Sequence, residues 1–192
     1  HQCFRRQRQM CIRDRHAISP VDGRYFSKTS RLKYFFSEMA LIKYRVLVEI
    51  EYFISLCELK LPELEKFNFN NFQNLRNIYL NFSEKDAIEI KEIEKLTNHD
   101  VKAVELFNVE KLKKLKLNKH IEFVNFCCTS EDINNLSYSM MLQRFLDIEF
   151  IPEVNVLQKN LNSLAKKYSK LSMLAFTHGC LLYTSPSPRD RQ

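Results

Sequence analysis

Four short segments of this sequence combine residue types that bind anions or transfer protons. The first, Ser19 to Tyr25, reads Ser-Pro-Val-Asp-Gly-Arg-Tyr. Its proline and glycine force a shaped loop, and the planar guanidinium of Arg24 suits a phosphate or a carboxylate. A simple tight turn explains the same residues, so this segment predicts a site only together with the others.

The second segment is Thr97-Asn98-His99-Asp100, which has the small polar residues of a helix start. Such a start presents backbone N–H donors and the positive end of the helix dipole, and both favour an anion. His99 adds a contact that depends on its protonation. The alternative is an ordinary N-cap with a surface histidine.

The third segment places two hydroxyls, Thr129 and Ser130, ahead of a long helical pattern. Hydroxyls and free amides together hold a carboxylate without a charged residue. Capping alone also accounts for them, because Thr129 and Asp132 have the spacing of a capping box. Asn134 and Asn135 are unusual inside a helix, since their side chains compete with the backbone, and we expect a buried polar role for them.

The fourth segment is Thr177-His178-Gly179, which follows the apolar stretch from Leu171 to Phe176. A histidine at this place is either a satisfied core residue or a general acid that emerges into a cleft. The tripeptide by itself does not decide between them.

The elements that position these segments are predicted to be helices throughout. Only Gly23 and Gly179 are glycines, and prolines are few, which favours long helices over a sheet. Caps and apolar spacing predict helices over 37–59, over 70–82, after Ser83, from Thr97 or Asp100, after Thr129, and from Pro152. We interpret the lysine-rich stretch 111–119 as a solvated helix end rather than a binding patch.

The apolar faces of these helices predict an all-α architecture in two parts, a helical domain over 16–120 and the start of a helical bundle over 121–179. The helix after Ser83 carries Ile88, Ile90, Ile93 and Leu96. The last helix has an inner face of Val154, Leu157, Leu161, Leu164 and Tyr168. Helices of this kind need further partners, so we expect the chain to be the front part of a longer polypeptide.

Both ends are predicted to be foreign to the protein. Met10 to Asp14 can be encoded by a DNA element whose reverse complement encodes Cys180 to Thr184, and this element resembles a transposon end used in sequencing libraries. We therefore expect 1–15 and 180–192 to be artefacts, with 1–15 disordered. Without these ranges the net charge of +7 falls to +2, because 23 of 30 basic and 21 of 23 acidic residues remain. A basic nucleic-acid surface is then not indicated.

Cysteine use and hydropathy predict a cytoplasmic protein. Outside the two ends only Cys57, Cys127 and Cys128 remain, and they lack the spacing of a zinc or redox site. Three unpaired thiols suit the reducing cytosol. No secretory signal and no membrane-spanning apolar run is visible.

Taken together, the four segments resemble the bacterial adenylosuccinate lyase family of the fumarase/aspartase superfamily. The resemblance covers nearly all of 16–179 and includes Leu41 to Val46, Thr97 to Glu105 and Cys128 to Leu136. It implies an all-helical homotetramer whose active sites draw on several subunits. It also implies cleavage of adenylosuccinate to AMP and fumarate, and the parallel release of fumarate from the succinylated aminoimidazole carboxamide ribotide, without a metal or organic cofactor.

The resemblance also assigns roles to individual residues. His178 is implied as the general acid, Thr129 and Ser130 hold the succinyl carboxylate, and Arg24 and Tyr25 bind the nucleotide. The same pocket is lined by Asn98, His99 and Asp100. The sequence departs from the family at Asn125, where relatives often carry histidine. The family's serine-bearing catalytic loop would follow Gly179, so we expect this polypeptide alone to be inactive.

Two alternatives remain open. Another fumarate-releasing member of the superfamily, such as argininosuccinate lyase or fumarase, shares the general pattern, although the Asp22–Tyr25 and Asn98–Asp100 segments disfavour it. A non-catalytic helical interaction module is the other alternative. Convergence of Arg24, His99, Ser130 and His178 in an assembled oligomer would distinguish an enzyme from a module.

Overall fold

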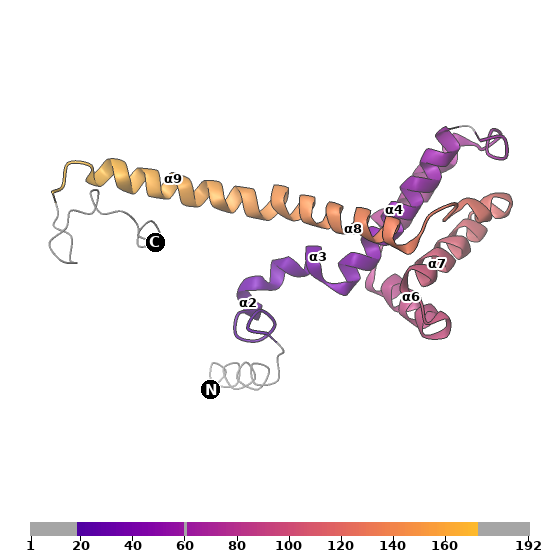
Figure 1. The fold of residues 1–192 in the computed structure, drawn as a ribbon, viewed down its shortest axis with the longest axis horizontal. Helices are drawn as coiled ribbons and strands as arrows, with labels where there is room; N and C mark the ends of the chain where they lie inside the picture. Colours follow the sequence, from indigo (N-terminus) through magenta and orange to yellow (C-terminus); the bar gives the residue numbers. More distant parts are fainter. Residues whose placement is uncertain (1–18, 60, 173–192) are drawn as a thin grey trace, which may run out of the picture. The chain divides into compact units, whose positions relative to one another are not determined.

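A computed structural model of the chain describes residues 19–59 and 61–172 (Figure 1). The described residues contain α, 3-10 and π helices and no strand, which confirms the all-α prediction. None of the described helices is both long and apolar enough to cross a membrane. The predictions about 1–15, 180–192 and His178 fall outside the described residues.

The chain divides into two compact units, 1–148 and 149–192. Within the described residues, the first unit starts with three short helices, α2 (Phe26–Thr29), η1 (Ser30–Leu32) and α3 (Lys33–Phe36). The domain boundary expected between residues 120 and 121 stays a prediction.

Helix α4 (Glu38–Glu58) is the central element of the first unit. Its N-cap is Ser37, whose Oγ accepts a hydrogen bond from the Ala40 amide at 3.2 Å, as the sequence predicts. Apolar side chains on several sides of α4 are fully buried, among them Val46, Ile50 and Phe53. Because α4 contacts α5, α6, α7 and α8, it is the scaffold on which the other helices are placed.

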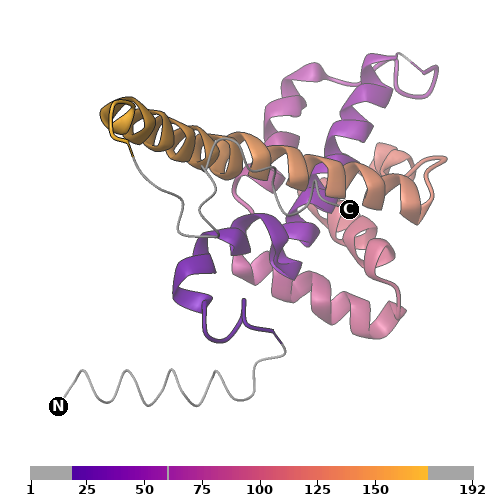
Figure 2. The same ribbon diagram turned by 60° about the vertical axis from the view of Figure 1, so that its left-hand side comes forward.

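Two helices, α6 (Glu84–Thr97) and α7 (Asp100–Lys114), lie side by side in both ribbon views (Figures 1 and 2). Helix α5 (Phe72–Leu80), preceded by η2 (Phe69–Asn71), packs on α4. Ile90 of α6 is buried as its spacing predicts, but Ile88 is 56% exposed and Leu96 is 88% exposed. Two of the four apolar positions expected of this helix therefore face solvent.

The lysine-rich stretch is a helix end, as expected, because α7 stops at Lys114 and η3 (Asn118–Phe123) follows. Helix α8 (Ser130–Phe145) then packs along α4, and a π turn spans Leu146–Phe150. In the second unit α9 (Ile151–Tyr168) carries Pro152 in its first turn, where a missing N–H costs no hydrogen bond.

Candidate functional site

The junction of α6 and α7 is shaped by residues 98–100. Asn98 closes α6 in the left-handed conformation at φ 51°, and His99 returns to an extended backbone. His99 is the N-cap of α7, because its Nδ1 accepts a hydrogen bond from the Lys102 amide at 3.0 Å. The helix expected to open at Thr97 or Asp100 thus begins at Asp100.

The first turn of α7 is already satisfied by its own side chains. Besides the Lys102 amide bound by His99, the Val101 amide donates to Asp100 Oδ1 at 2.8 Å. The expectation that this helix start offers open backbone donors to an anion is therefore wrong. What the junction presents instead is side-chain chemistry, namely the imidazole, the carboxylate and the amide of Asn98.

The start of α8 is a capping box, as the sequence predicts. The Thr129 amide and hydroxyl donate to Asp132 Oδ2 at 2.8 and 2.9 Å, and the Thr129 side chain accepts from the Asp132 backbone. These bonds lower the pKa of Asp132. The hydroxyl proton of Thr129 is therefore committed to Asp132, and the next hydroxyl along the chain is the one left for other contacts.

His99 and Ser130 join the two helix starts, with 3.4 Å between Nε2 and Oγ. Because Nδ1 accepts the Lys102 amide, the neutral ring carries its hydrogen on Nε2. Nε2 then donates to Ser130 Oγ, so the hydroxyl hydrogen of Ser130 points elsewhere. The pair forms a directed series of hydrogen bonds that ends in the Ser130 O–H, which has no acceptor within the part of the chain that the structure describes.

A buried arginine, which the sequence does not single out as a site residue, bonds to both helices of this junction. Arg45 of α4 is 5% exposed, and its Nε donates to Asn134 Oδ1 at 2.9 Å. Its second arm pairs with Asp100 Oδ2 at 2.6 Å. Burial alone would raise the pKa of Asp100, but the Val101 amide and the Arg45 guanidinium lower it. Its place amid an apolar face is the only signal that would have pointed to Arg45.

The two helix starts also share an apolar base. Val48 of α4, Val101 of α7 and Ile133 of α8 form a small buried cluster, separate from the main core. Asn134 has the polar partner expected of it, whereas Asn135 is exposed, so the buried role predicted for Asn135 is wrong. Helices α4, α7 and α8 therefore meet at this apolar cluster and at the guanidinium of Arg45.

A depression of about 520 Å³ opens beside the junction. Its lining residues are Lys91, Glu94, Lys95, Asn98, His99 and Asp100. Both lysines already have carboxylate partners, Glu38 and Glu94 for Lys91 and Glu92 for Lys95. The depression therefore offers space and mixed charge next to His99, without a free cluster of cations.

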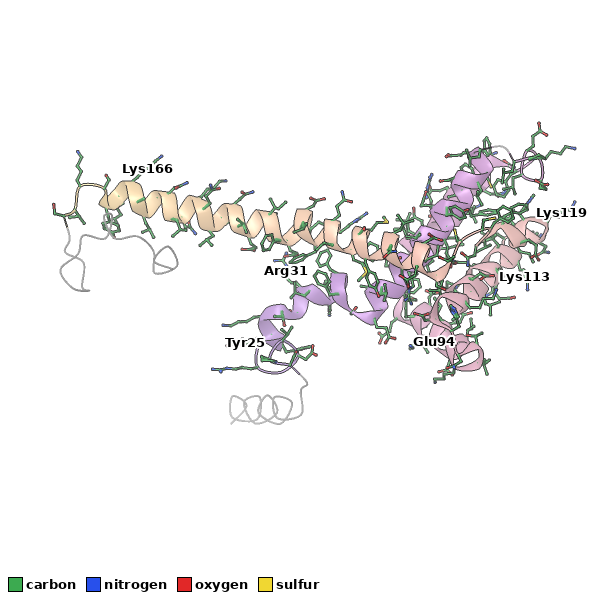
Figure 3. The ribbon with its side chains drawn as sticks, in the orientation of Figure 1. Tyr25, Arg31, Glu94, Lys113, Lys119 and Lys166 are labelled. Carbon is green, nitrogen blue, oxygen red and sulfur yellow. The ribbon has the colours of Figure 1, made fainter. Side chains whose placement is uncertain are left out.

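Arg24 and Tyr25 lie away from this junction. Both are exposed, and the Arg24 guanidinium sits over the Tyr25 ring at 5.6 Å. Figure 3 shows Tyr25 at α2 and Glu94, a lining residue of the depression, on α6. Among the described residues neither side chain bonds to the starts of α7 or α8. One chain brings His99, Asp100 and Ser130 together and leaves Arg24 and Tyr25 apart.

Asn125, the departure from the family pattern that the sequence resemblance pointed out, lies in the turn ahead of α8. Its Nδ2 donates to Glu105 Oε2 of α7 at 3.4 Å. Nearby, the Tyr52 hydroxyl donates to the Phe126 carbonyl at 2.7 Å, which ties this turn to α4. The residue therefore packs against the helices that carry the site instead of pointing into the depression.

Comparisons with known proteins identify the family of the chain. Residues 23–180 match the sequence profile of the lyase family. Adenylosuccinate lyase of Vibrio cholerae is 46% identical over 165 residues, which are 85% of this chain and 36% of that protein. The same enzyme of Dictyostelium discoideum is 46% identical over 170 residues, with equal coverage.

Adenylosuccinate lyase of Escherichia coli is 44% identical over 165 residues, again 85% of this chain and 36% of that protein. The chain therefore spans about a third of the length of these relatives. Since the family profile covers most of the sequence and the relatives share one name, the chain belongs to the lyase family and is similar to the front part of adenylosuccinate lyases.

Proposed function

We propose that the protein to which this chain contributes cleaves adenylosuccinate to AMP and fumarate, and releases fumarate from the succinylated aminoimidazole carboxamide ribotide. The family and the shared name of the relatives support the assignment. The reaction is a β-elimination. A base removes the proton next to a carboxylate, the electron pair forms the new double bond, and the C–N bond breaks toward a nitrogen that must gain a proton.

The observation that carries this proposal is the directed contact between His99 and Ser130. Negative charge develops on the substrate carboxylate as the proton leaves, and a pre-oriented O–H donor stabilises it. In this proposal Ser130 is that donor, and its role is supported by the His99 Nε2–H, which donates to Oγ and leaves the hydroxyl hydrogen for another acceptor. Thr129 shapes the same helix start, and the amides of Ser130 and Glu131 have no acceptor among the described residues.

The remaining residues complete the site in this proposal. His178 protonates the departing nitrogen. Arg24 and Tyr25 bind the nucleotide, with Arg24 at the phosphate, while Asn98 and Asp100 line the pocket with His99. Because Arg24 lies apart from His99 within one chain, we propose that the site is assembled between subunits of a homotetramer. No cofactor takes part, and the enzyme works in the cytoplasm.

The test uses a chimeric enzyme, called the joined enzyme from here on. In it, residues 16–179 replace the matching segment of the E. coli relative, and the rest of that relative follows. We expect it to release fumarate from adenylosuccinate, and His178→Gln to lower kcat by about 10²- to 10⁴-fold. The 192-residue chain alone should release none.

Two outcomes would overturn the proposal. One is a folded joined enzyme that is inactive on adenylosuccinate, and the other is preferential fumarate release from argininosuccinate. The matched control is Arg76→Met. It removes the ion pair between Arg76 of α5 and Glu51 of α4, and it should leave kcat unchanged.

A further inference from the structure

We infer that Arg45 is a positioning residue that sets the direction of the His99–Ser130 contact. The inference rests on the proposed function for its activity readout, but its structural readout does not depend on it. Among the described residues, Arg45 forms no hydrogen bond or ion pair with His99 or Ser130 themselves; it bonds to Asp100, which follows His99, and to Asn134, one turn beyond Ser130.

The buried guanidinium of Arg45 needs partners, because burying an unpaired charge costs free energy. Arginine stays charged in a protein, so a side chain only 6% exposed must be paired. Two of its nitrogens bond to two different helices, Nε to Asn134 of α8 and Nη2 to Asp100 of α7. A planar fork with two fixed bond directions sets the spacing of those two helices at their first turns.

The contacts of Arg45 and the His99–Ser130 contact together form a closed ring between α7 and α8. Asn134 lies one turn beyond Ser130 on α8, on the same side of the helix. Asp100 is the residue after His99. The two helix starts are therefore joined twice, directly through His99 and Ser130 at 3.4 Å, and indirectly through Arg45. Loss of the guanidinium leaves only the longer of these contacts between polar groups.

The charge on Asp100 influences which ring nitrogen of His99 carries the hydrogen. Asp100 Oδ1 lies 3.8 Å from His99 Nδ1, the atom that must stay unprotonated to cap α7. Arg45 neutralises this carboxylate from its other oxygen. Without Arg45, the unpaired charge attracts a hydrogen to Nδ1, and Nε2 then loses its hydrogen toward Ser130. Ser130 must in that case donate back to Nε2, and its O–H is no longer available to a substrate carboxylate.

The structural test is made on the 192-residue chain by ¹⁵N NMR of the His99 ring, assigned with His99→Gln, at a pH where the ring is neutral. We expect the Nε2–H form in the native chain and in the Arg76→Met control, and a shift toward the Nδ1–H form in Arg45→Met. Arg45→Lys, which keeps a positive charge beside Asp100, should restore the Nε2–H form. An unchanged ring in Arg45→Met overturns the inference.

Asn134→Leu keeps the Asp100 pair and serves if Arg45→Met does not fold. In it, the Nε2–H form should persist while the start of α8 loosens, seen as faster hydrogen exchange than in Arg76→Met at the Asp132 and Ile133 amides, which donate to Thr129. Equal exchange in the two variants counts against the positioning role.

The kinetic test uses the joined enzyme. Arg45→Met should lower kcat/KM about tenfold or more, because small displacements of a reacting group are costly, yet less than about twofold when Ser130→Ala is already present. A residue that only stabilises the fold would lower kcat/KM by the same factor in both backgrounds, and that result overturns the inference. An inactive native joined enzyme defeats the proposed function instead, and the ring measurement still decides the role of Arg45.

Discussion

Glu49 is the buried side chain whose chemistry is least expected from its type. It is fully buried on α4, where Asn108 Nδ2 of α7 donates to its Oε2 at 2.8 Å. Its other oxygen and the Asn108 oxygen are buried without a partner among the described residues. Burial raises the pKa of Glu49 to about 8, against the lowering effect of the Asn108 hydrogen bond. A proton on Glu49 supplies the donor that the two orphaned oxygens lack.

This protonation makes stability fall as the pH rises. The unfolded chain loses the Glu49 proton near 4.5 and the folded chain near 8. The stabilisation is thus complete below pH 4.5 and is lost up to about pH 8, at about 1.4 kcal/mol per pH unit. We expect Glu49→Gln, which keeps the shape without the charge, to flatten the profile of the unfolding free energy in urea between pH 5 and 8.

Glu51→Gln is the matched control on the same helix. The pKa of Glu51 is lowered, chiefly by its hydrogen bond from Arg76, so its carboxylate stabilises the fold at neutral pH and this contribution is lost as the pH falls. The control variant should therefore be weakened at pH 7, opposite to Glu49→Gln. Parallel pH profiles for Glu49→Gln and the native chain would refute a neutral Glu49.

Two helices of the first unit begin with the same capping device. In α6 the Ser83 amide and hydroxyl donate to Asp86 Oδ2 at 3.0 and 2.7 Å. In α8 Thr129 does the same toward Asp132. The devices are equivalent in bonding, but only the second starts the helix that carries Ser130.

Comparing the loss of each cap distinguishes its effect on stability from its effect on activity. We expect Ser83→Ala and Thr129→Ala each to lower the free energy of unfolding by about 1 kcal/mol, measured by urea denaturation. In the joined enzyme, only Thr129→Ala should also lower kcat/KM, because Ser130 then loses its fixed start. Equal kinetic losses in the two variants would show that helix stability, and not the placement of Ser130, controls activity.

At the scale of the whole molecule, the second unit presents a row of uncovered apolar side chains. Val154, Leu157, Leu161, Leu164 and Tyr168 follow helical spacing on α9 and are 44–57% exposed. A continuous apolar row of this kind is typical of a contact surface. The five residues are the inner face that the sequence predicts for this helix, here without a cover.

We expect the 192-residue chain to self-associate through this row. The double variant Leu157→Glu with Leu161→Glu should shift sedimentation velocity profiles toward smaller species, because charges on an apolar contact are costly to bury. The matched control, Gln158→Glu with Asn162→Glu, adds the same charge one position further along and should not shift them. Equal shifts in both variants would indicate that net charge alone controls association.

Local chemistry determined much of this fold in advance. Ser37, Ser83 and Thr129 each cap the helix expected of them, because a cap depends on residues within one turn. Helix α5 is shorter than predicted, Phe72–Leu80 against 70–82, since its first residues form the η2 turn. The positions of Asn98, His99, Thr129 and Ser130 at helix ends follow from the sequence for the same local reason.

Only the tertiary structure decided which of these groups are free to act. Local caps take up the Val101 and Lys102 amides and the Thr129 hydroxyl, but only the packing of α7 and α8 brings Ser130 to His99, 31 positions away. The pairing of Arg45 with Asn134 joins residues 89 positions apart, beyond the reach of any periodic pattern. Sequence therefore fixes the bonds within one helical turn, and helix packing decides which of the remaining groups meet, because residues distant in the chain come together only when the helices pack.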